Sequence, residues 1–254
     1  MTKPTLARVT SDIAHALAGG LTDSATPASR KVLVVGGFLA SGLRLAAGTV
    51  IGELGPRPTQ RLVLWDFERC PHSRPVREAL SILDLDVDVR PCPKGGTRFR
   101  PALEGRGVPR LEDPNTKDDL RGSTAIVRHL HAHYGVGRPP WFLTLTPVRV
   151  FTGLAARVLT GQRGAIVRPS RAPEKPLELW SFESSPYCRM VRAALCELEL
   201  PYVLHNVAKG SPKREAFVAR SGQMRVPYLV DPNTGAALFE SYAIERYLEA
   251  TYAA

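Results

Sequence analysis

The chain has 254 residues, 44% of them hydrophobic, which is enough for two small domains that each bury a core. Its formal net charge of +10 would suit nucleic acid, a membrane surface or small anionic ligands. The basic residues are scattered, and no helix-turn-helix, zinc-finger or RNA-binding pattern occurs. Nucleic acid is therefore not an expected partner, and the excess charge indicates a basic, well-solvated surface.

The N-terminal part, residues 1–60, is expected to be a helical leader. Leu6–Leu21 has apolar residues at helical spacing, and Phe38–Leu54 predicts a second helix. Val32–Leu54 is apolar enough to be considered as a membrane span. Arg44 lies at its centre, however, where an arginine costs about 2.5–3.5 kcal/mol. A helix packed on the globular body is favoured over membrane attachment.

Cysteine usage and the N-terminus suggest a compartment. The four cysteines fit no zinc spacing and are too few for a disulfide scaffold; they are Cys70, Cys92, Cys188 and Cys196. Met1–Gly20 is polar and amphipathic, unlike a cleavable signal peptide. A reducing, cytoplasmic location is expected.

The chain contains one stretch twice. Leu62–Arg77 reads LVLWDFERCPHSRPVR, and Leu177–Arg192 reads LELWSFESSPYCRMVR. At a slightly larger spacing, Asp113–Thr116 and Asp231–Thr234 both read DPNT. So many ordered matches indicate a tandem duplication, and a repeat decides the fold before any single element does.

Each copy predicts the same order of elements. In the first copy we expect strands at Leu62–Trp65, Asp86–Arg90, Val108–Glu112 and Asp119–Arg121, and helices at Pro71–Leu83 and Ser123–Tyr134, with Ser123 as the N-cap. The first two strands flank a single helix and should form a right-handed parallel unit. The second copy runs from Leu177 to Tyr252, and a connector helix is predicted at Val148–Leu159.

Cys70 is the candidate reactive group. Pro71 fits the first turn of a helix, which places Cys70 at the helix N-terminus. The helix dipole and unpaired N–H groups there favour a thiolate, and Arg69, His72 and Arg74 add positive charge. The alternative is an inert helix-cap cysteine.

This order of elements resembles the thioredoxin-like N-terminal domain of glutathione transferases and glutaredoxins. The motifs that carry the resemblance are Cys70-Pro71-His72-Ser73 or Ser185-Pro186-Tyr187-Cys188, Val108-Pro109 or Val226-Pro227, and Glu240-Ser241. Cys92-Pro93-Lys94-Gly95 and the two DPNT turns resemble, more narrowly, a family with two such domains in tandem. The expected fold is α/β, with thioredoxin-like domains at residues 61–135 and 177–254 and a helical linker at 136–176.

The resemblance implies a glutathione site in each copy. The bonds Val108–Pro109 and Val226–Pro227 would be cis and would present the valine backbone to the tripeptide as to an added strand. Glu240 would accept the γ-glutamyl amine, and Ser241 would bind the carboxylate at a helix N-terminus, with Ser123 as its counterpart. Lys213, or Arg98 in the first copy, would bind the glycyl carboxylate. The sulfur would reach Cys70 or Ser185.

The two copies are not equivalent. The first has Gly122 where the acidic residue belongs, and its Ser73 leaves a monothiol site that can form a mixed disulfide. The second has Glu240 and Ser241 but Ser185 at the nucleophile position. The expected division is chemistry at Cys70 and binding in the second copy.

Several other cysteines and histidines allow more than one interpretation. Cys92 either resolves an oxidised Cys70 or is a buried structural cysteine, and Cys188 and Cys196 are expected in the core. His72 either tunes Cys70 or is an exposed turn residue. His129, His131 and His133 alternate at i, i+2, which faces different sides of a helix, so no metal site is expected.

The leading hypothesis is a glutathione-dependent enzyme that acts on a small-molecule or protein thiol or disulfide, with glutathione as co-substrate. It would transfer thiols through Cys70 or assist conjugation through Ser185. The rival is a non-catalytic glutathione-binding or interaction module, because no helical domain for an electrophile pocket follows the second copy. Oligomer formation is left open.

Overall fold

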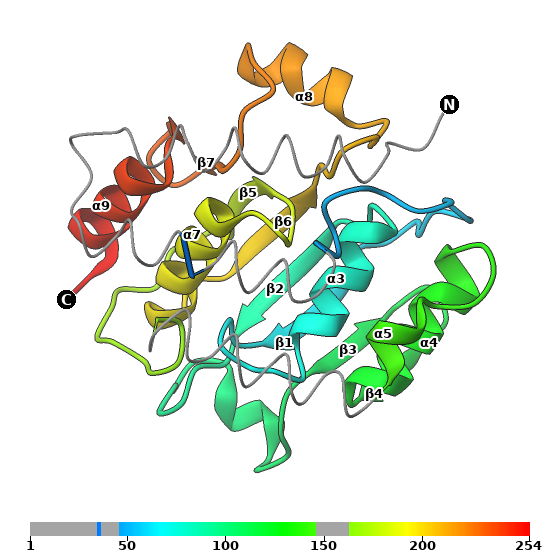
Figure 1. Ribbon diagram of the computed structural model, residues 1–254. Coiled ribbons are helices and arrows are strands. Elements are labelled where there is room, and N and C mark those ends of the chain that lie inside the picture. The colour runs from blue at the N-terminus through cyan, green and yellow to red at the C-terminus, as the bar shows by residue number, and fades with distance from the viewer. Residues whose placement is uncertain (1–34, 37–45, 146–162) are drawn as a thin grey trace.

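The computed structural model describes residues 35–36, 46–145 and 163–254 (Figure 1). The helices expected at Leu6–Leu21 and Val148–Leu159 lie outside these residues. No helix within the described ranges has the length and apolar character needed to cross a bilayer.

Both copies have the expected order of elements. The first comprises β1 Leu62–Asp66, α3 Arg74–Ile82, β2 Val87–Pro91, a 3-10 helix at Arg100–Leu103, β3 Arg110–Asp113, β4 Asp118–Arg121 and α4 Ser123–Tyr134, followed by the short α5 Trp141–Thr144. The second comprises β5 Leu177–Ser181, α7 Pro186–Glu197, β6 Tyr202–Asn206, α8 Arg214–Ser221, β7 Tyr228–Asp231, β8 Ala236–Phe239 and α9 Ser241–Tyr252. Strand β1 pairs parallel with β2, and β5 with β6, as the single helix between each pair requires.

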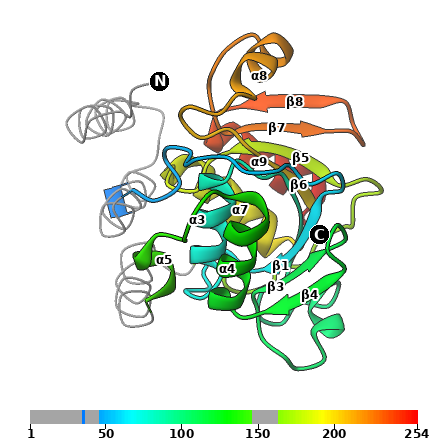
Figure 2. The ribbon, with the colours of Figure 1, turned by 90° about the vertical axis from the view of Figure 1, so that its right-hand side faces the viewer.

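The alternation of side chains along each central strand builds a core on each face of the sheet. Leu62 and Leu64 face a large cluster that also contains buried residues of α3, α4, α7 and α9. The next residue along, Trp65, faces the opposite side and packs with Cys92 and Leu103 of the 3-10 helix region. In Figure 2 the helices α3, α4 and α7 lie together on one side of the strands.

The two copies share one eight-stranded sheet, in the order β4-β3-β1-β2-β6-β5-β7-β8. In a single copy β2 would be an exposed edge strand; here it pairs antiparallel with its own counterpart β6. The register is Val87 opposite Leu204, Asp88 opposite Val203 and Val89 opposite Tyr202. Because the equivalent strands β2 and β6 pair antiparallel, with the equivalent residues Asp88 and Val203 opposite each other, the halves are related by a pseudo-two-fold axis, as in an isologous dimer.

A buried ion cluster lies between the copies. Arg192 donates to Glu68 of the other copy at 3.0 Å and approaches Glu183 at 2.8 Å. Arg77 reaches Glu183 at 3.2 Å and also pairs with Asp66. All these side chains are buried. The Leu62–Arg77 stretch and its repeat thus place the same Glu and Arg positions on both sides of the pseudo-axis, which gives Glu68 and Glu183 a role the sequence did not suggest.

Each segment that precedes one copy also pairs with the other copy, and these segments, residues 46–54 and 163–170, are called the exchanged segments below. Val50, ahead of the first copy, forms a β-bridge with Lys209 of the second. Ile166, ahead of the second copy, forms a parallel bridge with Lys94 of the first. The helix expected at Phe38–Leu54 is therefore wrong for residues 46–54, because Gly48 adopts a positive φ of 81° and the chain becomes extended to pair with Lys209.

Candidate functional site

The structure brings Cys70 next to Val108. The Cys70 N–H donates to the Phe67 carbonyl oxygen at 2.9 Å, and the sulfur lies 3.9 Å from the Val108 carbonyl oxygen. The Val108–Pro109 bond is cis, as is Val226–Pro227. Only 5% of Cys70 is exposed. The predicted thiol and the predicted valine–proline step thus lie next to each other, although β3 begins at Arg110 and leaves Val108 just ahead of the strand.

The helix after Cys70 starts later than expected. It begins at Arg74 rather than at Pro71, with Ser73 in the N-cap position and residues 71–73 in a turn. Pro75 explains the shift: it has no N–H to donate to a carbonyl four residues earlier, but it fits the first turn of a helix that begins at Arg74. Cys70 therefore precedes the helix by a turn.

Ser185, the counterpart of Cys70, is a true N-cap. The second copy has Met190 in place of Pro75, and α7 accordingly begins at Pro186. The Ser185 hydroxyl accepts a hydrogen bond from the Cys188 N–H at 3.3 Å, and the residue is buried. This hydroxyl satisfies the helix end, as N-cap serines do. Cys188 is fully buried, which raises the pKa of its thiol.

The last helices of the two copies start in the same unusual way. Glu240 is the N-cap of α9 with a φ of 65°, and Gly122 is the N-cap of α4 with a φ of 82°. Ser241 and Ser123 are the first helical residues and are buried, so the expectation that Ser123 is the N-cap is wrong. The chain must turn sharply from strand to helix, and a left-handed residue makes that turn.

Glu240 holds the left-handed conformation without being glycine, which is strained and often marks a functional position. Its carboxylate is 55% exposed and pairs with Arg225 at 2.5 Å, which is itself 60% exposed. A surface pair of this kind is weak and easily exchanged for another partner.

The charged groups of Lys213 and Arg98 are already paired within the protein. The Lys213 ammonium reaches Asp86 at 2.5 Å and Asp84 at 3.4 Å, both in the other copy. The Arg98 guanidinium donates to the carbonyl oxygens of Leu198 at 2.9 Å and Glu199 at 3.1 Å, again across the interface. We therefore withdraw both as ligands for the glycyl carboxylate, because interface acceptors already occupy their donors.

The remaining two cysteines, Cys92 and Cys196, are buried. Cys92 follows β2 and is fully buried beside Trp65, and burial raises the pKa of its thiol to about 12. A thiol held protonated is a poor partner for disulfide exchange, which favours the structural interpretation of Cys92. Cys196 is buried on α7 and donates to the Gly164 carbonyl oxygen at 3.5 Å.

The exchanged segments lie directly against both candidate nucleophile turns. The hydroxyls of Thr49 and Ser184 are 2.5 Å apart and buried, one residue from Ser185. The Arg69 N–H, one residue from Cys70, donates to the Gly164 carbonyl oxygen at 3.4 Å. Ser185 is 7% exposed. Each turn is thus held by the segment that precedes the other copy.

A two-copy α/β chain with a cis valine–proline step just ahead of the third strand of each copy defines a protein of thioredoxin-like class. The model of the family "Glutathione S-transferase, N-terminal domain" matches residues 64–148 and 179–254, which together are more than half of the chain. The chain therefore belongs to the glutathione S-transferase N-terminal domain family and carries that domain twice in tandem. Searches of curated proteins and of solved structures gave no match.

Proposed function

We propose that the protein binds glutathione and transfers it to and from a thiol through Cys70. The observation that carries this proposal is the 3.9 Å approach of the Cys70 sulfur to the Val108 carbonyl oxygen, in a chain of this family. A tripeptide thiol that lies along Val108 would bring its sulfur to Cys70. A reducing cytoplasm, which supplies glutathione, is part of the proposal.

The reaction is thiol–disulfide exchange at one cysteine. The Cys70 thiolate attacks a sulfur of a glutathione mixed disulfide; that S–S bond breaks, a bond between Cys70 and glutathione forms, and the leaving thiolate takes a proton. A second glutathione thiolate then displaces Cys70 and releases glutathione disulfide. Ser73 and the buried Cys92 offer no resolving thiol, which supports a monothiol route.

Intact-mass analysis after incubation with glutathione disulfide tests this route. We expect a single glutathione adduct on the wild-type protein, no adduct on Cys70→Ser, and an unchanged adduct on Cys92→Ser. Adduct formation on Cys70→Ser at the wild-type level would place the chemistry elsewhere and contradict the proposal.

In the second copy we propose that Glu240 holds the γ-glutamyl amine beside the Ser241 backbone. Glutathione would replace the exposed Arg225 as partner of the carboxylate. We expect Glu240→Gln to weaken glutathione binding about tenfold, since a charge-assisted hydrogen bond contributes roughly 1.5 kcal/mol more than a neutral one. Titration calorimetry measures this, with the exposed Glu215→Gln on α8 as the matched control. Equal affinities of the two variants would remove Glu240 from the site.

The burial of Cys70 and Ser185 favours a second candidate, a non-catalytic glutathione-binding or interaction module. Cys70 and Ser185 are both nearly covered, and the exchanged segments hold the turns that carry them. This candidate predicts calorimetric binding of glutathione by the wild-type protein with no adduct on Cys70. The mass measurement above therefore decides between the two.

A further inference from the structure

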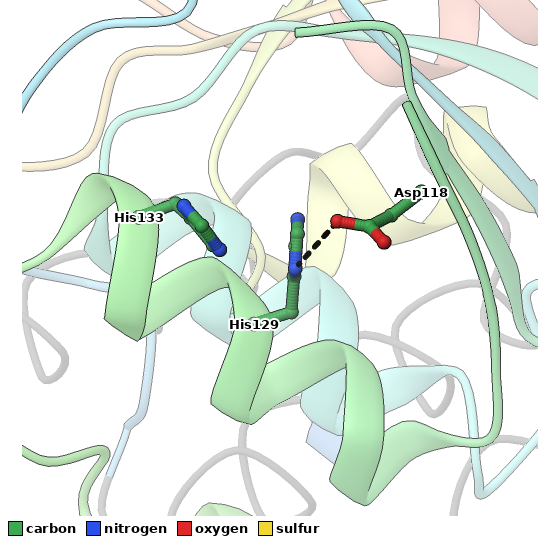
Figure 3. Close-up of side chains that lie close together, drawn as sticks. All are labelled: Asp118, His129 and His133. Atoms are coloured by element: carbon green, nitrogen blue, oxygen red, sulfur yellow. Dashed lines mark ion pairs between the residues drawn. The ribbon is translucent and has the colours of Figure 1, made fainter. Parts of the chain in front are cut away.

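Two imidazoles and a carboxylate converge on one side of the first copy. Asp118 at the start of β4 and His129 and His133 on α4 each offer a ligand atom, and these atoms lie within 4.8 Å of one another (Figure 3). The two histidines are separated by four residues, so they lie on the same face of the helix, with ring centroids 4.4 Å apart. His129 and His133 are thus an i, i+4 pair, whereas the expectation of no metal site considered only the i, i+2 spacing.

A buried carboxylate orients one of the imidazoles. Nε2 of His129 lies 2.8 Å from Oδ2 of Asp113, which is buried. The same oxygen accepts a hydrogen bond from the Tyr134 hydroxyl at 2.6 Å, and the Asn115 N–H donates to Oδ1 at 2.9 Å, so the fold holds this carboxylate in place. The contact of Nε2 with Asp113 fixes the orientation of the His129 ring and leaves Nδ1 for another partner.

The second ring nitrogen of His129 faces Asp118. Nδ1 of His129 lies 3.7 Å from Oδ2 of Asp118, and the Asp118 side chain is 46% exposed. The arrangement carboxylate–histidine–open position is the one that metal-binding histidines use, because the outer carboxylate fixes the ring and raises the basicity of its free nitrogen.

We propose that His129, His133 and Asp118 form a site for a divalent transition-metal ion, with Zn²⁺ as the best-fitting ion. Ligand atoms about 2.1 Å from a tetrahedral Zn²⁺ are roughly 3.4 Å apart, so the observed separations need only small side-chain rotations to close. Two imidazole nitrogens disfavour Ca²⁺ and Mg²⁺, which take oxygen ligands. Three protein ligands at an exposed position leave a fourth coordination position for water or an external ligand.

The second copy shows what this position looks like without the ligands. Tyr247 stands where the first copy has His129, and its hydroxyl donates to Asp231 at 2.6 Å, as His129 does to Asp113. Thr251 replaces His133, and Ala236 replaces Asp118 at the start of the corresponding strand. The fold requires only a hydrogen-bond donor to the turn aspartate, so this requirement explains His129 but explains neither His133 nor Asp118.

The comparison also supplies variants that should fold. His133→Thr and Asp118→Ala install the residues that the second copy carries at these positions. Titration calorimetry of the untagged, metal-stripped full chain with ZnCl₂ should show one ion bound per chain. We expect each variant to bind Zn²⁺ more than about 100-fold more weakly, since loss of an outer-shell partner alone costs 10–100-fold. The exposed His72→Ala should bind as the wild type does.

Cobalt spectroscopy tests whether a cysteine, rather than the proposed site, binds the metal ion. Co²⁺ at the proposed site should give d–d absorption without a thiolate-to-metal charge-transfer band. Absence of stoichiometric Zn²⁺ binding by the wild-type chain, unchanged affinity in His133→Thr and Asp118→Ala, or a thiolate band would each overturn the proposal.

Discussion

Replacing Arg192 by leucine should lower the free energy of unfolding by about 3–5 kcal/mol, the usual cost of removing one partner of a buried ion pair. The Arg192 guanidinium is 1% exposed and lies between Glu68 and Glu183, one from each copy. Burial alone would raise the pKa of Glu68, but Arg192, Arg77 and Arg189 outweigh burial and lower it to about 2. Without Arg192, a buried negative charge is left without its counterion.

Urea unfolding at neutral pH measures this loss. Arg61→Leu is the matched control, because Arg61 also pairs with a carboxylate, Asp88 at 2.8 Å, but with 53% of its side chain exposed. We expect the control to change stability by less than about 1 kcal/mol. A loss no larger than the control would show that the cluster does not hold the two copies together.

Charge balance makes a second test possible. The cluster sets three arginines against three carboxylates: Arg77, Arg189 and Arg192 against Asp66, Glu68 and Glu183. The double variant Arg192→Leu with Glu68→Gln restores neutrality and should recover a large part of the stability lost in Arg192→Leu alone. Simple additivity of the two single changes would contradict a charge-balance origin.

Gly164→Ala should lower the free energy of unfolding by about 3 kcal/mol or more. Gly164 has a φ of 74°, where a non-glycine residue costs roughly 1–2 kcal/mol. In addition, a Cβ there would lie 2.8 Å from the Glu68 Cβ and 3.2 Å from the Ala193 Cα. Overpacking of this kind adds about 1–3 kcal/mol.

Gly137→Ala separates the two contributions. Gly137 has a similar φ of 79°, but nothing lies within 4 Å of an added Cβ. Gly137→Ala should therefore lose only the stability that the backbone conformation costs. Thermal or urea unfolding of both variants measures the difference in their free energies of unfolding. Because the Gly164 carbonyl receives the Arg69 N–H, we also expect faster alkylation of Cys70 in Gly164→Ala. Equal losses in the two glycine variants would show that the linker is not tightly packed against the ion cluster.

The sequence predicts the architecture of each copy well, because the repeat supplies the same pattern twice. The central strands, the DPNT turns and the last helices are found close to their expected positions. The start of α3 is missed because Pro71 and Pro75 are both acceptable in a first helical turn, and only hydrogen bonding in the folded chain chooses between them. The N-cap at Gly122 is missed because serine is the commoner capping residue.

The sequence does not predict how the two copies pair across the pseudo-two-fold axis. Nothing local to β2 indicates that it pairs with β6, and nothing local to Lys213 indicates that its ammonium binds carboxylates of the other copy. Such contacts join residues far apart in sequence, and their partners are fixed only when the two copies dock.

The sequence by itself determined the duplication, the family and the residue types of the candidate sites, because these depend on motifs and periodicity. The tertiary structure decided which of those residues meet. It brought Cys70 to Val108 and His129 to Asp113 and Asp118, and it committed Arg98 and Lys213 to the interface. The physical reason is that a charged side chain is available for a ligand only if folding has not already satisfied it with a buried partner.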